Sequence, residues 1–297
     1  MATVDDLKQL RPNKEFFIGI DSDGCVFDTM EIKHKECFTP QFINHFGMQP
    51  VSKYAREVWE FVNLYSKTRG VNRFPAAVRV LDLLGQREEV RARHVTPAPM
   101  KGLRDWIQRE TKLGNATLAA EVERAGDTDL TRTLDWSEDV NASVKKIVRD
   151  VPPFPLFRES LAEIARSADA VVCSQTPTEA LEREWKEHGI GAAVRAICGQ
   201  ELGTKTEHIK YVAGGKYDLQ KCLMIGDAPG DMKAAKANGI LFYPINPGAE
   251  EASWKRFHDE ALQRFFSGTY AGDYEDHVIE EFGSFLPEDP PWQTQTR

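Results

Sequence analysis

The 297-residue sequence lacks the features that would place a protein in a membrane, on nucleic acid or outside the cell. No apolar run approaches the length of a membrane span, and the first residues, Met-Ala-Thr-Val-Asp-Asp-Leu-Lys, contain no apolar segment of the kind that a secretory leader has. With a formal net charge of −8, it also lacks the basic excess that favours nonspecific binding to nucleic acid or membrane surfaces. We therefore expect a cytoplasmic protein without a membrane or nucleic-acid partner.

Cysteine and histidine do not occur in ligand spacings. The five cysteines form no C-x-x-C pair, so we interpret them as reduced thiols, three of them in or beside apolar strand patterns. The seven histidines are scattered, which argues against a zinc site. Internal repeats and low-complexity tracts are absent as well. What remains is an ordinary globular composition, with 41% hydrophobic residues and enough length for one large or two ordinary domains.

A pair of aspartates directly after an apolar run is the most informative feature of the sequence. Residues 16–20 read Phe-Phe-Ile-Gly-Ile, and Asp21, Ser22, Asp23 and Gly24 follow. Side chains two apart on a strand point the same way, so both carboxylates would project from its carboxyl end, where α/β sheets bind ligands. Two such carboxylates repel each other unless a cation or a shared proton reduces the repulsion, and a pair of carboxylate oxygens is a ligand set that Mg²⁺ prefers. An Asp-rich turn is the alternative interpretation.

A second acidic group follows another apolar run. Residues 220–231 read Gln-Lys-Cys-Leu-Met-Ile-Gly-Asp-Ala-Pro-Gly-Asp, so Asp227 ends a buried type of strand and Asp231 starts a helical segment. The carboxyl ends of parallel strands lie on one edge of a sheet, so these residues and Asp21 would share one site. A plain turn at Asp227, and a first-turn acid favoured by the helix dipole at Asp231, are the alternatives.

Two further polar residues lie between these clusters. The strand pattern of residues 169–174 ends in Ser174, which is placed to hydrogen-bond a phosphate oxygen, and Gln175 opens a helix whose backbone N–H groups favour anions. Lys205 lies near the start of another helix, where the helix dipole disfavours a cation unless an anion offsets it. Alternatively, Ser174 is a helix N-cap and Lys205 a solvated surface charge.

In combination, these motifs resemble the haloacid dehalogenase-like (HAD) hydrolase superfamily. The shared order is Asp-x-Asp-Gly after a strand, then a strand ending in Ser, then Lys, then a strand followed by Gly-Asp-x-x-x-Asp. The flanking elements cover residues 15–29 and 150–245. The resemblance implies an α/β fold with a Rossmann-like parallel sheet flanked by helices. It also implies a Mg²⁺-dependent phosphatase that acts on a small phosphorylated metabolite through an aspartyl phosphate.

The resemblance implies catalytic roles residue by residue. Asp21 would be the nucleophile and Asp23 the general acid/base. Ser174 would bind phosphate and Lys205 would balance charge. The substrate-binding candidates near these residues are Gly24 and Gln175.

The same resemblance implies a Mg²⁺ site. Asp227 would hold the ion with Asp21 and the backbone carbonyl of Asp23, and Asp231 would assist the metal or the lysine. Cys25 stands where members of the superfamily often carry threonine. This departure leaves the carboxylates intact, so we interpret it as a variation in packing.

The long interval between the first strand and the serine strand has helical periodicity. We expect helices over residues 54–68, from Pro75 to Gly85, and over residues 101–113, 116–125 and 137–149. This interval resembles a C1-type cap of the superfamily, which implies a helical cap domain at 30–149 and a discontinuous α/β core at 1–29 and 150–297. Helices that belong to the main domain are the alternative.

One loop of the expected cap concentrates cations. It runs from Ser66 to Phe74 and contains Lys67, Arg69, Asn72 and Arg73. Arginine forks suit carboxylate or phosphate, so Arg69, Asn72 and Arg73 are candidates for substrate recognition. The alternative is a helix C-terminus stabilised by basic residues.

Several alternatives stay open from the sequence alone. Aromatic residues from Trp254 on suggest a helix and tail that pack on the core or form a dimer contact, and we expect the Pro-Glu-Asp-Pro-Pro-Trp stretch to be extended. We therefore expect a monomer or a homodimer.

A phosphomutase is the nearest alternative function. A catalytically silent scaffold, or a regulatory domain that accepts phosphate, is the alternative from another class.

Overall fold

A computed structural model describes residues 3–294 and forms two compact units. The first, here called the α/β unit, holds Met1–Met30 and Asp150–Pro287. The second, here called the helical unit, holds Glu31–Arg149 and Glu288–Arg297. Among the described residues, no helix combines the length and the apolar character that a membrane crossing requires.

The α/β unit is built on a five-stranded parallel sheet. Its strands stand in the order β3-β2-β1-β4-β5. Their bounds are β1 (Phe16–Ile20), β2 (Ala168–Cys173), β3 (Ala196–Cys198), β4 (Cys222–Gly226) and β5 (Leu241–Pro244). β2 and β4 are buried along their whole length, as expected for parallel strands that are covered on both faces. Ile20 pairs with both Val172 and Ile225, so the first, second and fourth strands end at one edge.

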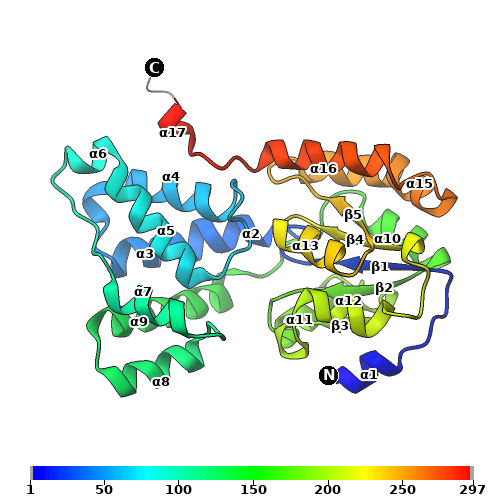
Figure 1. The fold of residues 1–297 in the computed structure, drawn as a ribbon, viewed down its shortest axis with the longest axis horizontal. Coiled ribbons are helices and arrows are strands. Elements are labelled where there is room, and N and C mark those ends of the chain that lie inside the picture. The colour runs from blue at the N-terminus through cyan, green and yellow to red at the C-terminus, as the bar shows by residue number, and fades with distance from the viewer. Residues whose placement is uncertain (1–2, 295–297) are drawn as a thin grey trace. The chain divides into compact units, whose positions relative to one another are not determined.

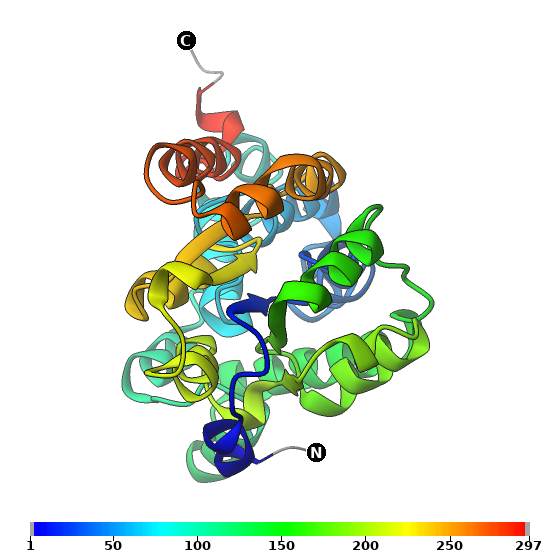
Figure 2. The same cartoon turned by 90° about the vertical axis from the view of Figure 1, so that its right-hand side faces the viewer.

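Helices cover both faces of this sheet. Ile18 and Ile20 pack into one cluster with residues of α10, α14 and α15, whereas Phe17 on the other face packs with α1, α12 and α13. Figures 1 and 2 show the green α10 and the yellow α13 on opposite sides of the strands. The helices of the unit are α1 (Val4–Gln9), α10 (Phe157–Ser167), α11 (Thr178–Glu187), α12 (Lys205–Ala213), α13 (Pro229–Ala237), α14 (Glu250–Arg256), α15 (Leu262–Ser267) and α16 (Asp273–Phe285).

The helical unit has a core rich in aromatic side chains. Trp59 and Trp136 are fully buried, with ring centroids 5.8 Å apart, and Phe42 and Phe74 pack beside them. Its elements are α2 (Thr29–Ile32), which starts in the α/β unit, a π-helical turn (Lys33–Phe38), α3 (Thr39–His45), α4 (Ser52–Asn63), α5 (Arg73–Gln86), α6 (Glu88–Arg91), α7 (Lys101–Arg109), α8 (Asn115–Ala125), α9 (Thr128–Ile147) and α17 (Pro291–Thr294).

The structure differs from the expected helix over residues 137–149. α9 starts at Thr128, because the Asp127 side chain accepts hydrogen bonds from the backbone N–H groups of Asp129 and Leu130 and so caps the helix. Leu130 and Trp136 then extend the buried face of this helix towards its N-terminus, ahead of residue 137.

The end of the described chain also differs from the expectation, which placed residues 150–297 in the α/β core. Trp292 packs on the Phe61 ring at 5.4 Å and lies 4.6 Å from the guanidinium carbon of Arg87, and Lys67 pairs with Glu288 at 3.0 Å. These partners all belong to the helical unit. The segment from Glu288 on therefore packs with that unit, since the indole finds aromatic and cationic partners there.

His208 on α12 makes the stability of the α/β unit depend on pH. The side chain is fully buried, and burial lowers the pKa of His208 from 6.5 to about 4. The unfolded chain therefore binds this proton at a higher pH than the folded chain, so the free energy of unfolding decreases as the pH falls from 6.5 towards 4. We expect His208→Gln to make this decrease shallower, as measured by urea unfolding at a series of pH values.

The exposed His277 provides the control. His277→Gln should keep the parent's dependence of unfolding free energy on pH. Equal slopes for His208→Gln and the parent between pH 6.5 and about 4 would contradict this account of His208.

Candidate functional site

The candidate site lies at the carboxyl edge of the sheet, where the register aligns the ends of three strands. The backbone N–H of Asp21 donates to the carbonyl of Ile225 at 2.9 Å, and the N–H of Ser174 donates to the carbonyl of Cys198 at 2.9 Å. Asp21, Ser174 and Asp227 are all buried there. The structure thus brings to one edge residues that lie up to about two hundred positions apart in the sequence, as parallel strands allow.

Three buried carboxylates gather around one lysine. Asp21, Asp227 and Asp231 each offer an oxygen, and these oxygens lie within 4.8 Å of one another. The Lys205 ammonium is 2.7 Å from Oδ2 of Asp21 and 2.5 Å from Oδ1 of Asp231. We call these four residues the acidic cluster. It has three acidic groups for one cation, so a divalent metal ion fits its donor set and charge.

Asp231 reaches this cluster because its neighbours leave it room. Its Oδ2 accepts a hydrogen bond from the backbone N–H of Ala228 at 3.0 Å, at the first turn of α13. A side-chain carbon added at Gly226 would lie 2.3 Å from Cγ of Asp231, closer than any real contact. Only glycine at position 226 therefore permits this placement. Asp231 does serve as a first-turn acid, and it also holds Lys205.

The electrostatics of the cluster follow from burial and charge. Burial raises the pKa of Asp21 well above its ordinary value; Lys205 opposes this shift, whereas Asp231 and Asp227 add to it. Burial alone would lower the pKa of Lys205, but the nearby carboxylates outweigh it and raise that pKa. The lysine therefore stays charged, and the excess of negative charge falls on the carboxylates.

The Asp23 carboxylate accepts hydrogen bonds from two hydroxyl groups. The Thr29 hydroxyl donates to its Oδ1 and the Thr176 hydroxyl to its Oδ2, each at 2.5 Å. Neither threonine was identified from the sequence as a partner of Asp23. No spacing rule links them to it, because Thr29 starts α2 whereas Thr176 follows β2. The side chain of Asp23 is thereby fixed in place next to the acidic cluster.

The turn between the two aspartates is held by the core behind it. Ser22 is fully buried, and its hydroxyl accepts a hydrogen bond from the Trp185 indole at 3.0 Å. Gly24 has φ of 74°, a conformation that favours glycine, and its N–H donates to the carbonyl of Phe27 at 2.8 Å. Gly24 thus shapes the loop through its backbone.

The region after β2 departs from the expected anion-binding helix start. α11 begins at Thr178 rather than at Gln175, and its first N–H donates to the Glu201 carboxylate at 3.0 Å. A carboxylate of the chain therefore occupies this helix start. The Gln175 amide donates to the carbonyl of Gly203 at 3.1 Å, which ties this loop to the one before Lys205. The Ser174 hydroxyl accepts from the N–H of Thr176 at 3.2 Å.

The three substrate-recognition candidates in the loop from Ser66 to Phe74 differ in their contacts. Arg69 is buried and donates to the carbonyl of Leu64 at 2.8 Å. Asn72 caps α5, since its side chain accepts from the N–H of Phe74 at 3.0 Å, and it donates to the carbonyl of Leu113. The side chains of Arg69 and Asn72 therefore both make hydrogen bonds within the helical unit. Arg73 instead lies among hydroxyl, amide and aromatic groups of the helical unit.

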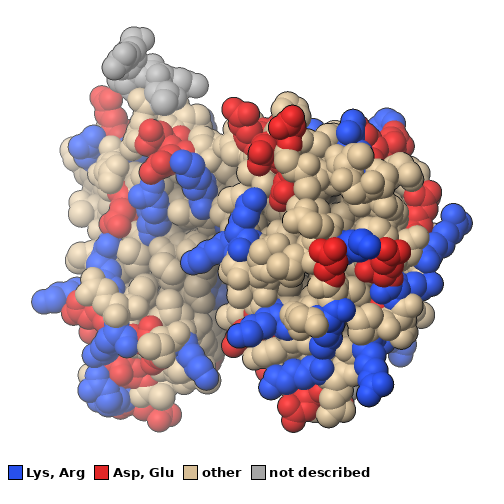
Figure 3. Space-filling view, turned by 45° about the vertical axis from the view of Figure 1, so that its right-hand side comes forward, with Lys and Arg blue, Asp and Glu red and all other residues tan. Residues whose placement is uncertain are grey.

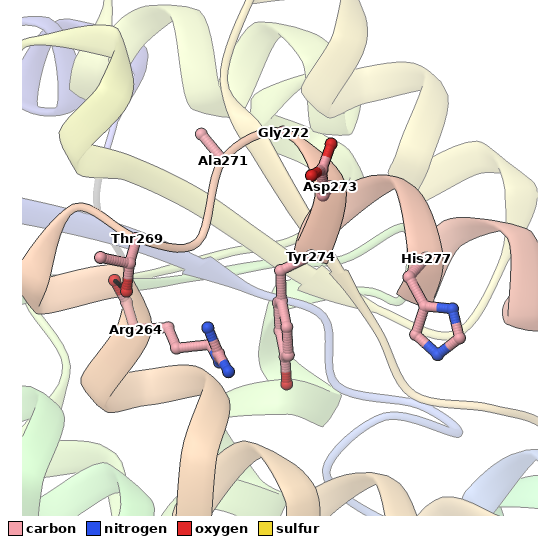
Figure 4. A pocket seen from close by; sticks show the side chains of 7 residues that line it. All are labelled: Arg264, Thr269, Ala271, Gly272, Asp273, Tyr274 and His277. Carbon is pink, nitrogen blue, oxygen red and sulfur yellow. Dashed lines mark hydrogen bonds between the residues drawn. The ribbon is translucent and has the colours of Figure 1, made fainter.

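A hollow of about 630 Å³ lies elsewhere in the α/β unit, between α15 and α16. Figure 4 shows Arg264 and Tyr274 side by side in it, with His277 further along α16. The guanidinium carbon of Arg264 is 4.5 Å from the centre of the Tyr274 ring, and its Nε pairs with Glu260 at 2.8 Å. The cation of this hollow therefore already has a counter-ion, and none of the acidic-cluster residues lines it.

Comparisons with known proteins agree with this fold. A family model described as haloacid dehalogenase-like hydrolase matches residues 18–239, about three quarters of the chain. Among curated proteins, none matches the sequence.

Solved structures are similar at low identity. One is a candidate phosphoglycolate phosphatase from Lactobacillus delbrueckii, with 16% identity, a TM-score of 0.48 and coverage of 83% of this chain and 92% of that one. Another is a candidate β-phosphoglucomutase from Bacteroides vulgatus, with 13% identity, a TM-score of 0.45 and coverage of 86% and 92%. At this level of identity, the two structures do not indicate which substrate this protein uses.

Lys205 should be essential to the stability of the metal-free protein. Lys205→Met would leave three buried carboxylates without their cation, and removing one partner of a buried ion pair costs about 3–5 kcal/mol. We expect the free energy of unfolding in EDTA at neutral pH to fall by roughly that amount, as measured by urea unfolding. Added Mg²⁺ should restore part of the loss, because a ligand that binds the folded state stabilises it.

The exposed Lys210 on the same helix is the control for this experiment. Lys210→Met should unfold like the parent, with and without the metal. A Lys205→Met protein as stable as the parent in EDTA would show that the charge balance does not matter to the fold.

Proposed function

Because the chain belongs to the haloacid dehalogenase-like hydrolase family, we propose that it is a Mg²⁺-dependent phosphatase that hydrolyses a phosphate monoester of a small metabolite through an aspartyl phosphate. The observation that carries this proposal is the acidic cluster, in which three buried carboxylates share one lysine at the carboxyl edge of the sheet. Asp23 stands two residues after Asp21, and two hydroxyl groups fix its carboxylate.

In this proposal, Asp21, Asp227 and the backbone carbonyl of Asp23 hold the Mg²⁺. When bound, the ion supplies positive charge that neutralises the phosphate oxygens. Asp231 does not contact the ion in this proposal, because its two oxygens already contact Lys205 and the N–H of Ala228. The role of Asp231 is therefore to position Lys205 rather than to bind the metal.

Side chains of the protein act as the nucleophile and as the general acid/base in both steps of this proposal. A carboxylate oxygen of Asp21 attacks phosphorus, the bond to the ester oxygen breaks, and protonated Asp23 gives its proton to that leaving oxygen. Water then attacks phosphorus, Asp23 takes a proton from it, and the bond between phosphorus and Asp21 breaks. Lys205 and the Ser174 hydroxyl hold the phosphate oxygens throughout both steps. Asp23 ends protonated, ready for the next turnover.

The charge distribution on the surface is consistent with a small substrate. On the face drawn in Figure 3, basic and acidic side chains are interspersed over each of the two units rather than sorted into a field of one sign. Large single-sign fields are typical of proteins that bind polyanions such as nucleic acids. This face therefore agrees with a small phosphorylated metabolite as the partner.

A screen of phosphorylated metabolites for phosphate release tests this function. We expect release with Mg²⁺ and none in EDTA, and none from Asp21→Asn, because an amide is a poor nucleophile and a weak metal ligand. Unfolding curves of that variant verify that the fold persists. Isomerised products without phosphate release would instead indicate a phosphomutase. Full activity of Asp21→Asn would refute the assignment of Asp21 as the nucleophile.

Metal titrations test the assignment of Asp227. We expect Asp227→Ala to need more Mg²⁺ than the parent for half-maximal phosphate release, since the ion loses one carboxylate ligand. Titration curves that coincide with the parent's would remove Asp227 from the metal site.

The leaving group of the ester tests Asp23. Asp23→Asn should slow the hydrolysis of alkyl phosphates by about 10²–10⁴-fold, the usual contribution of a positioned acid/base. Esters with very good leaving groups need no proton at the first step, so that step should suffer less. Undiminished hydrolysis of alkyl phosphates by the variant would contradict this role.

A further inference from the structure

Thr176 lies in the loop that follows β2, and each of its polar groups makes a hydrogen bond. Its backbone N–H donates to the Ser174 hydroxyl at 3.2 Å, and its own hydroxyl donates to Oδ2 of Asp23 at 2.5 Å. Its backbone carbonyl accepts from the N–H of Gln200 at 3.1 Å. This one residue therefore connects the proposed phosphate-binding hydroxyl, the proposed general acid/base and the chain segment that follows β3.

The segment after β3 holds this loop by close backbone contact. Gly199 is buried, and a side-chain carbon added there would lie 2.5 Å from the backbone nitrogen of Thr178 and 2.6 Å from the carbonyl oxygen of Thr176. Real side-chain carbons do not come so close, so only glycine permits this approach. Glu201 adds a second attachment, because its carboxylate accepts from the Thr178 hydroxyl at 2.7 Å. The backbone of Thr176 is thereby fixed from outside its own loop.

The Asp23 carboxylate is held through both of its oxygens. Thr29 donates to Oδ1 from the start of α2, and Thr176 donates to Oδ2 from the loop after β2. Donors on both oxygens fix the plane of the carboxylate, whereas a single donor leaves it free to rotate about that one hydrogen bond. A group that transfers a proton has to be held within about 0.5 Å of its productive position. The loss of the Thr176 hydroxyl should therefore misplace the acid.

Thr178 shows a different use of a threonine in the same part of the chain. Its hydroxyl and its backbone N–H both donate to the Glu201 carboxylate, at 2.7 and 3.0 Å. These hydrogen bonds join α11 to the segment after β3 and do not involve Asp23. Thr178 is therefore a matched control for Thr176, since it has the same side chain and also contacts the segment after β3.

We propose that Thr176 is a positioning residue for Asp23, and that residues 199–201 place Thr176. Thr176 does not touch the reacting atoms in this proposal. It acts by holding the carboxylate that gives its proton to the leaving oxygen. This inference rests on the proposed phosphatase function, and it assigns a role in that function to residues that none of the sequence motifs includes.

The dependence of the rate on the leaving group tests this role. Propyl phosphate needs a proton on its leaving oxygen, whereas dinitrophenyl phosphate does not, and kcat/KM covers the steps up to the release of that oxygen. The kcat/KM value for dinitrophenyl phosphate is divided by the value for propyl phosphate. We expect Thr176→Val to raise this ratio by about tenfold or more, because a misplaced acid slows only the ester that needs it. A purely structural defect would lower both values and leave the ratio unchanged.

Two further variants are the controls for this experiment. Thr176→Ser keeps a hydroxyl group, so its ratio should be close to that of the parent. Thr178→Val should keep the parent's ratio even where its unfolding curve shows a lower stability. A folded Thr176→Val protein with the parent's ratio would refute the role of Thr176.

A backbone substitution tests the segment after β3. Gln200 starts a short 3₁₀ helix, Gln200–Leu202, and the first position of a helix accepts proline. Gln200→Pro removes the N–H that bonds to the carbonyl of Thr176, whereas Gln200→Ala keeps it. We expect the leaving-group ratio to rise in Gln200→Pro, as in Thr176→Val, and to stay unchanged in Gln200→Ala. The same ratio in both variants would refute the role of this segment.

Crystal structures test the positioning without turnover. We expect the Asp23 carboxylate of Thr176→Ser to lie as in the parent. In Thr176→Val it should turn away from position 176 or occupy more than one conformation. A carboxylate that keeps the parent's single position in Thr176→Val would overturn the inference.

The outcomes separate this inference from the function on which it rests. If neither ester releases phosphate but the Asp23 carboxylate moves in Thr176→Val, the proposed hydrolysis fails and the positioning of Asp23 by Thr176 stands. If both esters are hydrolysed with the same ratio in the parent and in Thr176→Val, the hydrolysis stands and the role of Thr176 is refuted.

Discussion

The α/β unit depends on one electrostatic constraint, the sharing of a single lysine by three buried carboxylates. Lys205 contacts Asp21 and Asp231 directly, and Asp227 completes the acidic cluster. This cluster requires that β1 and β4 end at the same edge and that position 226 carries no side chain. The net negative charge that remains favours a divalent cation and, with it, an anionic substrate. The fold and the proposed chemistry therefore follow from the same arrangement.

Part of this arrangement could be predicted from the sequence, for a simple geometric reason. Asp21 and Asp227 each follow an apolar run, and parallel strands bring such positions to one edge without any further information. The partners of Asp23 could not be predicted in this way. Thr29 and Thr176 reach it from two separate segments whose spacing carries no signal. Similarly, the Pro-rich tail gave no indication that Trp292 would pack on Arg87.

In the basic loop of the helical unit, residues 66–74, amino-acid composition alone does not predict which side chain binds a ligand. The sequence offered Arg69, Asn72 and Arg73 as equivalent candidates, because all three can bind an anion. The structure uses Asn72 as a helix cap and directs Arg69 to a backbone carbonyl, whereas Arg73 donates to the side chains of Ser137 and Asn141 on α9. Only side-chain contacts distinguish these roles, and a linear sequence does not contain them.

The central claim is that Asp21 forms a covalent bond with the transferred phosphoryl group. The most direct measurement is to quench the protein with acid during turnover of a hydrolysed phosphate ester, reduce it with borohydride, and analyse its peptides by tandem mass spectrometry. An aspartyl phosphate is reduced to homoserine, so the account predicts homoserine at position 21 only when both ester and Mg²⁺ are present. Unmodified Asp21 under these conditions, or homoserine at another aspartate, would contradict it.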